Sequence, residues 1–349
     1  MNNRLLSASC ALLTVLSLSS AACREMTMPP ADVQPTDATA NDRPDPSDVQ
    51  GNDVQNPPTD GGMDGGGSTN VTLRQLQDIT DPAHPMANAR VNLVQSDLVA
   101  LTPRLLVGSS RMVDQCRWVV WVGTGAGGDF GGIQVQELVP RGAAADCFEP
   151  SVVGKIPADI MPGARITSVT NANFNEFCAG PTGINRAMCR NYEQSQLFLG
   201  AATAAVNVMG SGGTATPADV SVAAVGQGAM GVLGMRTLPL EGALIRIPMS
   251  NVRVTMSVAD GGASFTTYAL VDPTDSTRSL EVQISNFTQT TCARNFFSSR
   301  NGMSTGAVTG ILVPDFGVWK VRIRDAADVQ GLDCNTDGGA PMDASSSGG

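Results

Sequence analysis

The sequence has 349 residues, of which 42% are hydrophobic and only 4% aromatic, and its formal net charge is −10. The acidity lies mostly outside the main part of the chain. Residues 24–70 carry nine acids against two arginines, residues 331–349 carry three aspartates, and residues 71–330 carry 20 acids against 19 bases. A nearly neutral main part excludes a globally acidic protein and a strongly basic nucleic-acid binder.

Residues 1–22 have the pattern of a secretory signal peptide. Arg4 precedes an apolar run from Leu5 to Leu18, which is short for a transmembrane helix. The following segment, Leu18-Ser19-Ser20-Ala21-Ala22-Cys23, resembles the lipobox of bacterial lipoproteins. The resemblance implies that Cys23 is diacylated and anchors the protein in the outer membrane, facing the periplasm or the cell surface. An ordinary signal-peptidase site, with Cys23 in a disulfide, is the alternative.

Residues 23–70 are predicted to form a disordered tether. They contain no aromatic residue, leucine or isoleucine, so they cannot bury enough apolar surface to offset the entropy of ordering. Repulsion among the acidic residues extends such a chain. The segment therefore predicts a spacer that holds a domain away from a membrane.

A weak internal repeat predicts two similar β domains at 71–235 and 236–330, followed by a flexible tail at 331–349. Three apolar segments recur in the same order along the chain. The matches pair Val91 with Ile245, Val119 with Tyr268, and Ile166 with Val308. Three ordered matches indicate an internal duplication in which the loops of the second copy are shorter.

Each copy predicts a long first strand, a hairpin, a connecting segment and a second pair of strands. The expected strands are 89–101, 117–122, 132–138, 164–170 and 192–199 in the first copy, and 243–258, 265–271, 279–287, 306–312 and 317–324 in the second. This order is typical of the OB-fold, a small Greek-key barrel. The expected fold is therefore all-β, with two tandem OB-like Greek-key β-barrels after the tether. A β-sandwich is the competing fold, because pattern alone does not decide barrel closure.

The two ends of this region resemble OB-like repeats of secreted bacterial proteins. The resemblance rests on Leu73 to Ile79 before the first strand, and on Val308 to Leu312 and Trp319 to Val329 at the end. Such repeats often accompany extracellular nucleases, and they also occur alone in uncharacterised surface lipoproteins. No nuclease motif accompanies them in this chain, so the resemblance implies a fold and not a catalytic activity.

Six cysteines remain after Cys10 and Cys23 are set aside, and an even number in an exported chain predicts three disulfides. Spacing alone allows 15 pairings. The preferred pairs are Cys178–Cys189, which would close a loop with Gly and Pro, Cys116–Cys147, which would tie a hairpin base, and Cys292–Cys334, which would hold the tail. Zinc binding is the alternative, and it is disfavoured because there is no CxxC motif and the only histidine, His84, lies between prolines.

No catalytic residue, cofactor or metal site is predicted. Gly123–Gly128 fits GxGxxG, but an alternating strand follows it where a dinucleotide site needs a helix, so the segment predicts a hairpin loop. Asp272 with Asp275, and Asp325 with Asp328, are interpreted as turn or cap residues rather than paired carboxylates. The aromatic residues are interpreted as core rather than as a stacking platform: Trp118, Trp121, Phe174, Phe177 and Phe316.

Lys320, Arg322 and Arg324 alternate along a predicted strand and form a candidate face for an anion or another ligand, although a solvated surface is the simpler interpretation. The sequence as a whole predicts a lipid-anchored envelope protein that acts as a non-enzymatic binding or scaffolding module. Its predicted partners are the membrane, through the lipid, and an unknown protein or polymeric ligand. The alternatives are an accessory nucleic-acid or oligosaccharide binder of an extracellular system, and a hydrolase with an unrecognised site.

Overall fold

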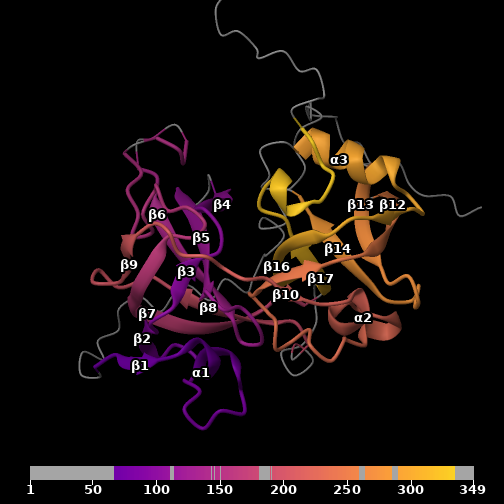
Figure 1. Cartoon of the computed structure of the whole chain (residues 1–349). Helices are drawn as coiled ribbons and strands as arrows, with labels where there is room; N and C mark the ends of the chain where they lie inside the picture. Colours follow the sequence, from indigo (N-terminus) through magenta and orange to yellow (C-terminus); the bar gives the residue numbers. More distant parts are fainter. Residues whose placement is uncertain are drawn as a thin grey trace, which may run out of the picture. The chain divides into compact units, whose positions relative to one another are not determined.

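The computed structural model describes residues 67–110, 114–142, 144, 146–149, 151–180, 189, 191–258, 264–284 and 290–334. The predicted signal peptide, Cys23, most of the tether and the end of the tail lie outside the described residues. The described chain is all-β, with two mixed sheets and few helical residues (Figure 1).

The first half of the described chain forms a nine-stranded sheet. Its strands are β1 (Thr69–Val71), β2 (Arg90–Val94), β3 (Leu98–Ala100), β4 (Leu105–Ser110), β5 (Gln115–Thr124), β6 (Gly132–Pro140), β7 (Arg165–Cys178), β8 (Glu193–Phe198) and β9 (Ala205–Gly210). β2 and β3 are successive parts of the long first strand. β3 pairs with β5, β5 with β6, β6 in parallel with β8, β8 with β7, and β7 with β2. The pairings therefore return to the strand from which they started.

The second half forms an eight-stranded sheet with the same core pairings. Its strands are β10 (Ala218–Asp219), β11 (Leu244–Ile247), β12 (Ser250–Val258), β13 (Ser264–Val271), β14 (Ser279–Gln283), β15 (Ser304–Thr305), β16 (Val308–Asp315) and β17 (Val318–Arg322). β12 pairs with β13, β13 with β14, β14 in parallel with β17, β17 with β16, and β16 with β11. Pairing at both ends of one bent strand is the arrangement of an OB-like barrel, and two separate stacked sheets would lack it. We call the two halves the first and second barrel.

Each barrel begins with a short strand and a short helix. β1 pairs in parallel with β2 and leads into α1 (Leu73–Gln77), whose N-cap Thr72 forms a capping box with Gln75. β10 pairs in parallel with β11 and leads into α2 (Val222–Val225), whose N-cap is Ser221. The repeat thus extends to these segments. The boundary after residue 235 stays a prediction, and β10 and α2 precede it.

Three further helical segments lie in the second half. They are α3 (Thr290–Ser299) and the 3-10 turns η2 (Ala229–Gly231) and η3 (Ala326–Asp328). α3 occupies the predicted connecting segment between β14 and β16, where the sequence analysis named no helix. Ala293 and Phe297 bury one side of α3, and the Phe297 ring lies 5.9 Å from the Tyr268 ring.

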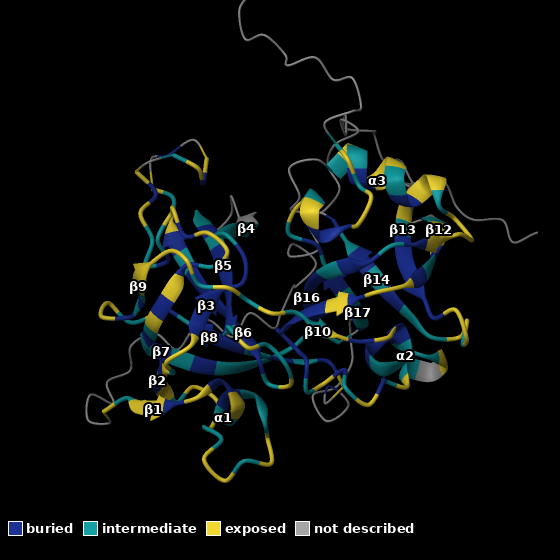
Figure 2. Cartoon of the chain, viewed as in Figure 1, coloured by how far each residue is buried: buried dark blue, intermediate teal, exposed yellow. Residues whose placement is uncertain are grey.

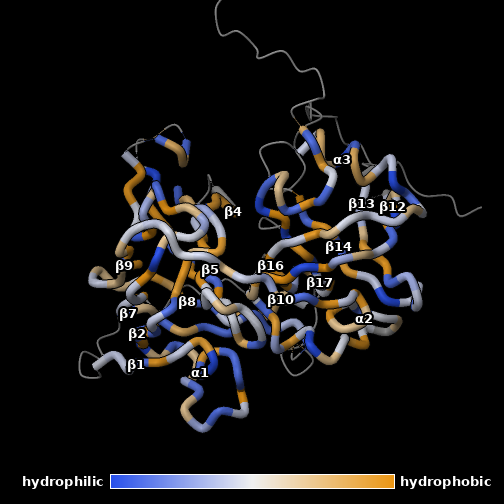
Figure 3. The backbone as a smooth tube through the Cα atoms, in the orientation of Figure 1, coloured by the Kyte–Doolittle hydropathy of each residue, from blue (hydrophilic) through white to orange (hydrophobic). Residues whose placement is uncertain are grey.

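Three apolar clusters hold the described chain together. Trp118 and Phe174 lie in the core of the first barrel, and Trp319 lies in the core of the second. The third cluster joins the barrels, because Val119 and Trp121 of β5 pack with β16 residues that include Ile311. β5 therefore buries both of its faces. Figure 2 shows buried residues along the strands and exposed residues on α3, and Figure 3 shows the apolar stretches within both groups of strands.

Candidate functional site

The three predicted cations of β17 and its continuation all have partners inside the protein. Lys320 Nζ lies 2.8 Å from Asp315 Oδ2 and 3.6 Å from Glu281 Oε2. Both carboxylates belong to neighbouring strands, β16 and β14. Lys320 thus forms part of a half-buried ion-pair group on the outer side of the second barrel.

Arg324 is held by Asp328 and by the first barrel. Its Nη2 and Nε donate to the Asp328 carboxylate at 2.6 and 2.9 Å, and its Nη1 donates to the Leu101 carbonyl oxygen at 3.0 Å. Burial disfavours the charge, but hydrogen bonding and attraction from Asp328 outweigh burial and raise the pKa of Arg324. Arg324 therefore links the two barrels. Whether the three cations bind a ligand stays a prediction.

Arg322 lies against the first barrel. Its guanidinium sits over the Trp121 ring, 4.8 Å from the ring centroid, and its Nε donates to Gln283 Oε1 at 3.0 Å. Burial lowers the pKa of Arg322 to about 10, with attraction from Asp315 opposing the shift and repulsion from Arg117 adding to it. Trp121, interpreted from sequence as core, is buried at this junction between the barrels and not inside either one. The core interpretation of Phe316 was wrong, because Phe316 lies in the turn between β16 and β17 and is 37% exposed.

A row of amides continues the junction across β6 and β8. Arg117 donates from Nε and Nη2 to Gln136 Oε1, at 3.0 and 2.9 Å. Gln136 Nε2 donates to Gln196 Oε1 at 2.6 Å, and Gln196 Nε2 donates to Gln194 Oε1 at 3.0 Å. All three glutamines are buried although they alternate with core residues. Because these hydrogen bonds follow one another, each amide polarises the next and strengthens its hydrogen bond.

Glu241 is buried at the other end of the junction, where it is 4% exposed. Gln77 Nε2 donates to the Glu241 carbonyl oxygen at 2.7 Å and lies 3.2 Å from Glu241 Oε2. The same amide also donates to the Gly132 carbonyl oxygen. Burial raises the pKa of Glu241 to about 8, and hydrogen bonds from the Ser195 N–H and Gln77 oppose the shift.

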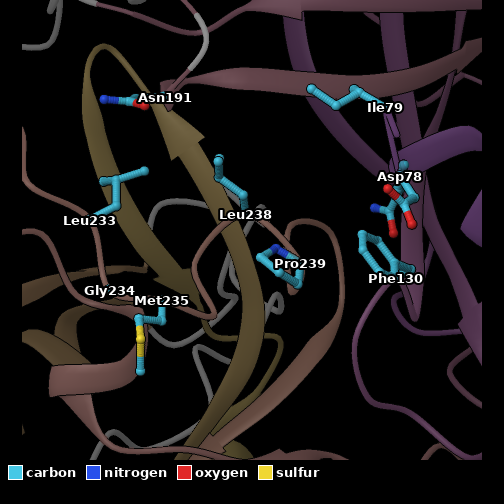
Figure 4. Close-up of a pocket in the computed structure, with 10 residues that line it drawn as sticks. Asp78, Ile79, Phe130, Asn191, Leu233, Gly234, Met235, Leu238 and Pro239 are labelled. Carbon is cyan, nitrogen blue, oxygen red and sulfur yellow. The ribbon is translucent and has the colours of Figure 1, made fainter. Parts of the chain in front are cut away.

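An open groove of about 330 Å³ lies beside this buried contact. Its lining comes from the end of α1, the β5–β6 turn and the segments around residues 191 and 233–239. The lining residues are Gln77, Asp78, Ile79, Phe130, Asn191, Leu233, Gly234, Met235, Leu238 and Pro239 (Figure 4). Phe130, in the left-handed backbone region at φ 57°, donates its N–H to the Pro239 carbonyl oxygen and so fixes one wall.

The groove is lined by more apolar than polar surface, and its rim charges are paired. Met235 is 96% exposed, Ile79 47% and Leu238 42%. Asp78 pairs with Arg74 at 3.3 Å, and Asp129, next to Phe130, pairs with Arg236 at 2.7 Å. A ligand of this groove would thus meet exposed apolar side chains and two acids that are already neutralised.

The predicted turns are confirmed. Gly123–Gly128 spans the end of β5 and the turn into antiparallel β6. Asp272 accepts hydrogen bonds from the Thr274 N–H and hydroxyl, at 2.8 and 2.6 Å, and Asp275 does the same for Thr277. Asp325 caps η3, and Asp328 holds Arg324.

The three preferred disulfides form in the structure: Cys116–Cys147, Cys178–Cys189 and Cys292–Cys334. His84 has other partners. Its Nδ1 lies 2.9 Å from the Gln75 carbonyl oxygen and its Nε2 lies 3.2 Å from Glu176 Oε1, while its ring packs edge-on against Phe174. The histidine therefore ties the loop after α1 to β7.

In the part of the chain that the structure describes, no group of three or more His, Cys, Asp or Glu side chains is placed to hold a metal ion. None of the helices in that same part is both long enough and apolar enough to cross a membrane.

The sequence patterns indicated few of these junction residues. Gln136, Gln283 and Arg117 were not singled out by any sequence pattern. The one signal available was the continuous apolar run from Trp118 to Val122, which places apolar side chains on both faces of β5 but does not say what covers the outer face. Glu241 and Met235 lie in an irregular segment without periodicity, so nothing in the sequence singled them out.

Comparison with known proteins adds little. No protein-family model matches the chain, and none of the curated proteins is similar to it. Two solved structures of the single-stranded DNA binding protein from Thermus aquaticus are similar at a low level. The wild-type structure is 14% identical to this chain, and a deletion mutant is 12% identical. Each match covers 65% of this chain, together with 87% of the wild-type structure and 89% of the mutant structure. Both TM-scores are 0.18. At TM-scores this low, the similarity supports no conclusion about this chain.

Proposed function

We propose that this chain is a lipid-anchored envelope protein whose two barrels act together as a non-enzymatic binding module. The groove beside Glu241 would dock an uncharged, apolar segment of a partner protein. The observation that carries this proposal is the convergence of exposed apolar side chains from both barrels, chiefly Ile79, Met235 and Leu238. Apolar surface gathered in one open groove is typical of an interaction site.

The charges around the groove favour an uncharged occupant. Asp78 and Asp129 each have an arginine partner, so a charged segment would gain no new ion pair there without breaking one. An apolar segment would instead release water from the exposed side chains, at roughly 25 cal/mol per Å² of buried apolar area.

Site-specific photocrosslinking on intact cells tests the docking site. A photoreactive residue at position 235 should give one discrete crosslinked protein, and Leu238→Asp should abolish that product by placing a charge in the groove. The matched control is the same residue at position 86, because Met86 is 84% exposed and is not among the groove-lining residues. Equal products at both positions, or a product unaffected by Leu238→Asp, would contradict the proposal.

The anchor is tested separately at Cys23. Cys23→Ala should abolish labelling of the protein by radioactive palmitate while export continues. Cys10→Ala is the matched control and should leave labelling of the mature protein unchanged. Labelling that persists in Cys23→Ala would show that the segment before it is not a lipobox.

A further inference from the structure

The carboxyl group of Glu241 and the amide of Gln77 each have one buried oxygen without a hydrogen-bond partner among the described residues. These atoms are Glu241 Oε1 and Gln77 Oε1. The other halves of the same two groups are in contact, since Gln77 Nε2 lies 3.2 Å from Glu241 Oε2. A carboxylate only accepts hydrogen bonds, so an ionised Glu241 leaves both of these oxygens without a donor.

The surroundings of Glu241 supply few donors to an ionised carboxyl group. Gln77 Nε2 has two hydrogens but three acceptors, which are Glu241 Oε2 and the carbonyl oxygens of Gly132 and Glu241. The Ser195 N–H lies 3.4 Å from Oε2. Burial raises the pKa of Glu241 to about 8, and these hydrogen bonds oppose the shift without outweighing it.

The charged side chains on the neighbouring elements are engaged with partners of their own. These elements are α1, β6, β8, β16, the β5–β6 turn and the segment before Glu241. Their ion pairs are Arg74–Asp78, Arg104–Glu137, Asp129–Arg236 and Asp315–Lys320, and Glu193 of β8 is also engaged. None of these groups shifts the pKa of Glu241, so no cation of the described residues compensates an ionised Glu241.

We propose that Glu241 is a neutral acid whose hydroxyl group donates to Gln77 Oε1, and that this pair is a proton-dependent switch of the groove. The contact of Gln77 Nε2 with Glu241 Oε2 is the second point of the pair. A single proton supplies what both unpartnered oxygens lack, because Oε1 of the acid becomes the donor and Oε1 of the amide accepts from it. As a form of regulation, the switch rests on the proposed function of the groove.

Gln77 connects the pair to the groove. It lines the groove at the end of α1, while its amide binds the carbonyl oxygens of Gly132 and Glu241. Loss of the proton places a negative oxygen against Gln77 Oε1 at a residue that is 4% exposed, so the amide turns away or water enters. Either change moves the α1 wall of the groove. Docking is therefore complete at low pH and is lost as pH rises through about 8.

Carbon-13 NMR of the mature protein, labelled at the methionine methyl groups, tests the switch without any partner. Met235 lines the groove, and Met86, which is 84% exposed and not among the lining residues, is a control in the same spectrum. As pH rises past neutrality, the Met235 signal should shift with a midpoint of about 8, and the Met86 signal should not. Glu241→Gln should abolish the shift, because glutamine keeps both points of the pair and does not ionise. Asp219→Asn removes an exposed acid of the second barrel outside the groove and should keep it.

Infrared spectroscopy of the wild type measures the proton itself and keeps the test decisive if Glu241→Gln does not fold. At neutral pH the spectrum should contain the C=O band of a protonated carboxylic acid, and this band should disappear over the pH range in which the Met235 signal shifts. Three results would overturn the switch: a Met235 signal that ignores pH, the same shift in Glu241→Gln, or no protonated-acid band at neutral pH. Failed crosslinking at position 235 together with a normal Met235 titration would instead contradict the docking proposal alone.

Discussion

Glu137 shows how single residues stabilise the first barrel. Its carboxylate is 1% exposed and accepts hydrogen bonds from the backbone N–H groups of Lys155 and Ile156. Arg104 Nη2 lies 3.3 Å from Glu137 Oε1, and the Arg104 guanidinium stacks on Trp118 at 4.1 Å. The buried cation and the carboxylate thus compensate each other, and the backbone amides orient the carboxylate.

Glu137→Gln should lower the free energy of unfolding by about 3 kcal/mol, because it leaves the Arg104 charge buried without its counter-charge. Urea unfolding measures the change. The matched control is Asp219→Asn, which breaks the exposed pair with Arg246 and should cost less than about 1 kcal/mol. Similar losses in the two variants would show that burial does not govern the strength of these pairs.

Glu241→Gln should change how stability depends on pH. The folded-state pKa of Glu241 is about 8, against an ordinary value of 4.5, so the folded protein keeps a proton that the unfolded chain releases. Stability from this group is complete below the ordinary value and is lost as pH rises toward about 8. The slope reaches about 1.4 kcal/mol per pH unit.

Urea unfolding at several pH values from 5 to 8 should therefore show a steeper decline for the wild type than for Glu241→Gln. Glutamine remains neutral and can keep the hydrogen bonds with Gln77 and Ser195. Parallel pH profiles for the two proteins would show that Glu241 titrates normally in the folded state.

At the scale of elements, the principal strands of both barrels were predicted, whereas β1, β4, β9, β10, β15 and the helix α3 were not. Alternation such as Trp319, Val321 and Ile323 against polar neighbours indicates a strand from local pattern alone. The sequence of α3, TTCARNFFSS, contains few strong helix formers, and only Ala293 and Phe297 are fully buried. Packing on Tyr268 and the disulfide of Cys292 position this helix, and both depend on distant parts of the chain.

The stabilisation that each disulfide contributes should increase with the number of residues in the loop that it closes. Cys292 and Cys334 are 42 residues apart, whereas Cys178 and Cys189 are 11 apart. Replacing the first pair by serine should cost about 4 kcal/mol and the second about 3 kcal/mol, because a longer closed loop restricts the unfolded chain more. Calorimetry of the two double variants gives the order, and a larger loss for the shorter loop would contradict this explanation.

At the scale of the whole molecule, the junction makes the barrels one unit. Trp121 and Val119 share an apolar cluster with Ile311 and Val313, and Arg324 reaches the Leu101 carbonyl oxygen. The sequence predicted two barrels but not this contact, because surface strands with buried outer faces look like ordinary core strands. The groove could not be predicted from local sequence patterns either, because its walls come from segments far apart in the chain.

Gly132→Ala should separate the unfolding of the two barrels. A Cβ at Gly132 would lie 2.1 Å from the Gly242 carbonyl oxygen, so two backbones would have to move apart. We expect calorimetry to show two transitions where the wild type shows one, at a cost of about 1–3 kcal/mol. Gly67→Ala is the control, since no atom lies within 4 Å of that added carbon. One unchanged transition in Gly132→Ala would refute the coupling.

The short parallel strands β1 and β10 affect how neighbouring molecules can pair with the edges of the two sheets. Each lies along its barrel's first strand, with Thr69 to Val71 beside β2 and Ala218 to Asp219 beside β11. An uncovered strand edge presents N–H and C=O groups that pair with another chain and start aggregation. β1 and β10 are the end strands of their sheets and are only three and two residues long, so a neighbouring molecule at high density would find a very short edge to pair with there.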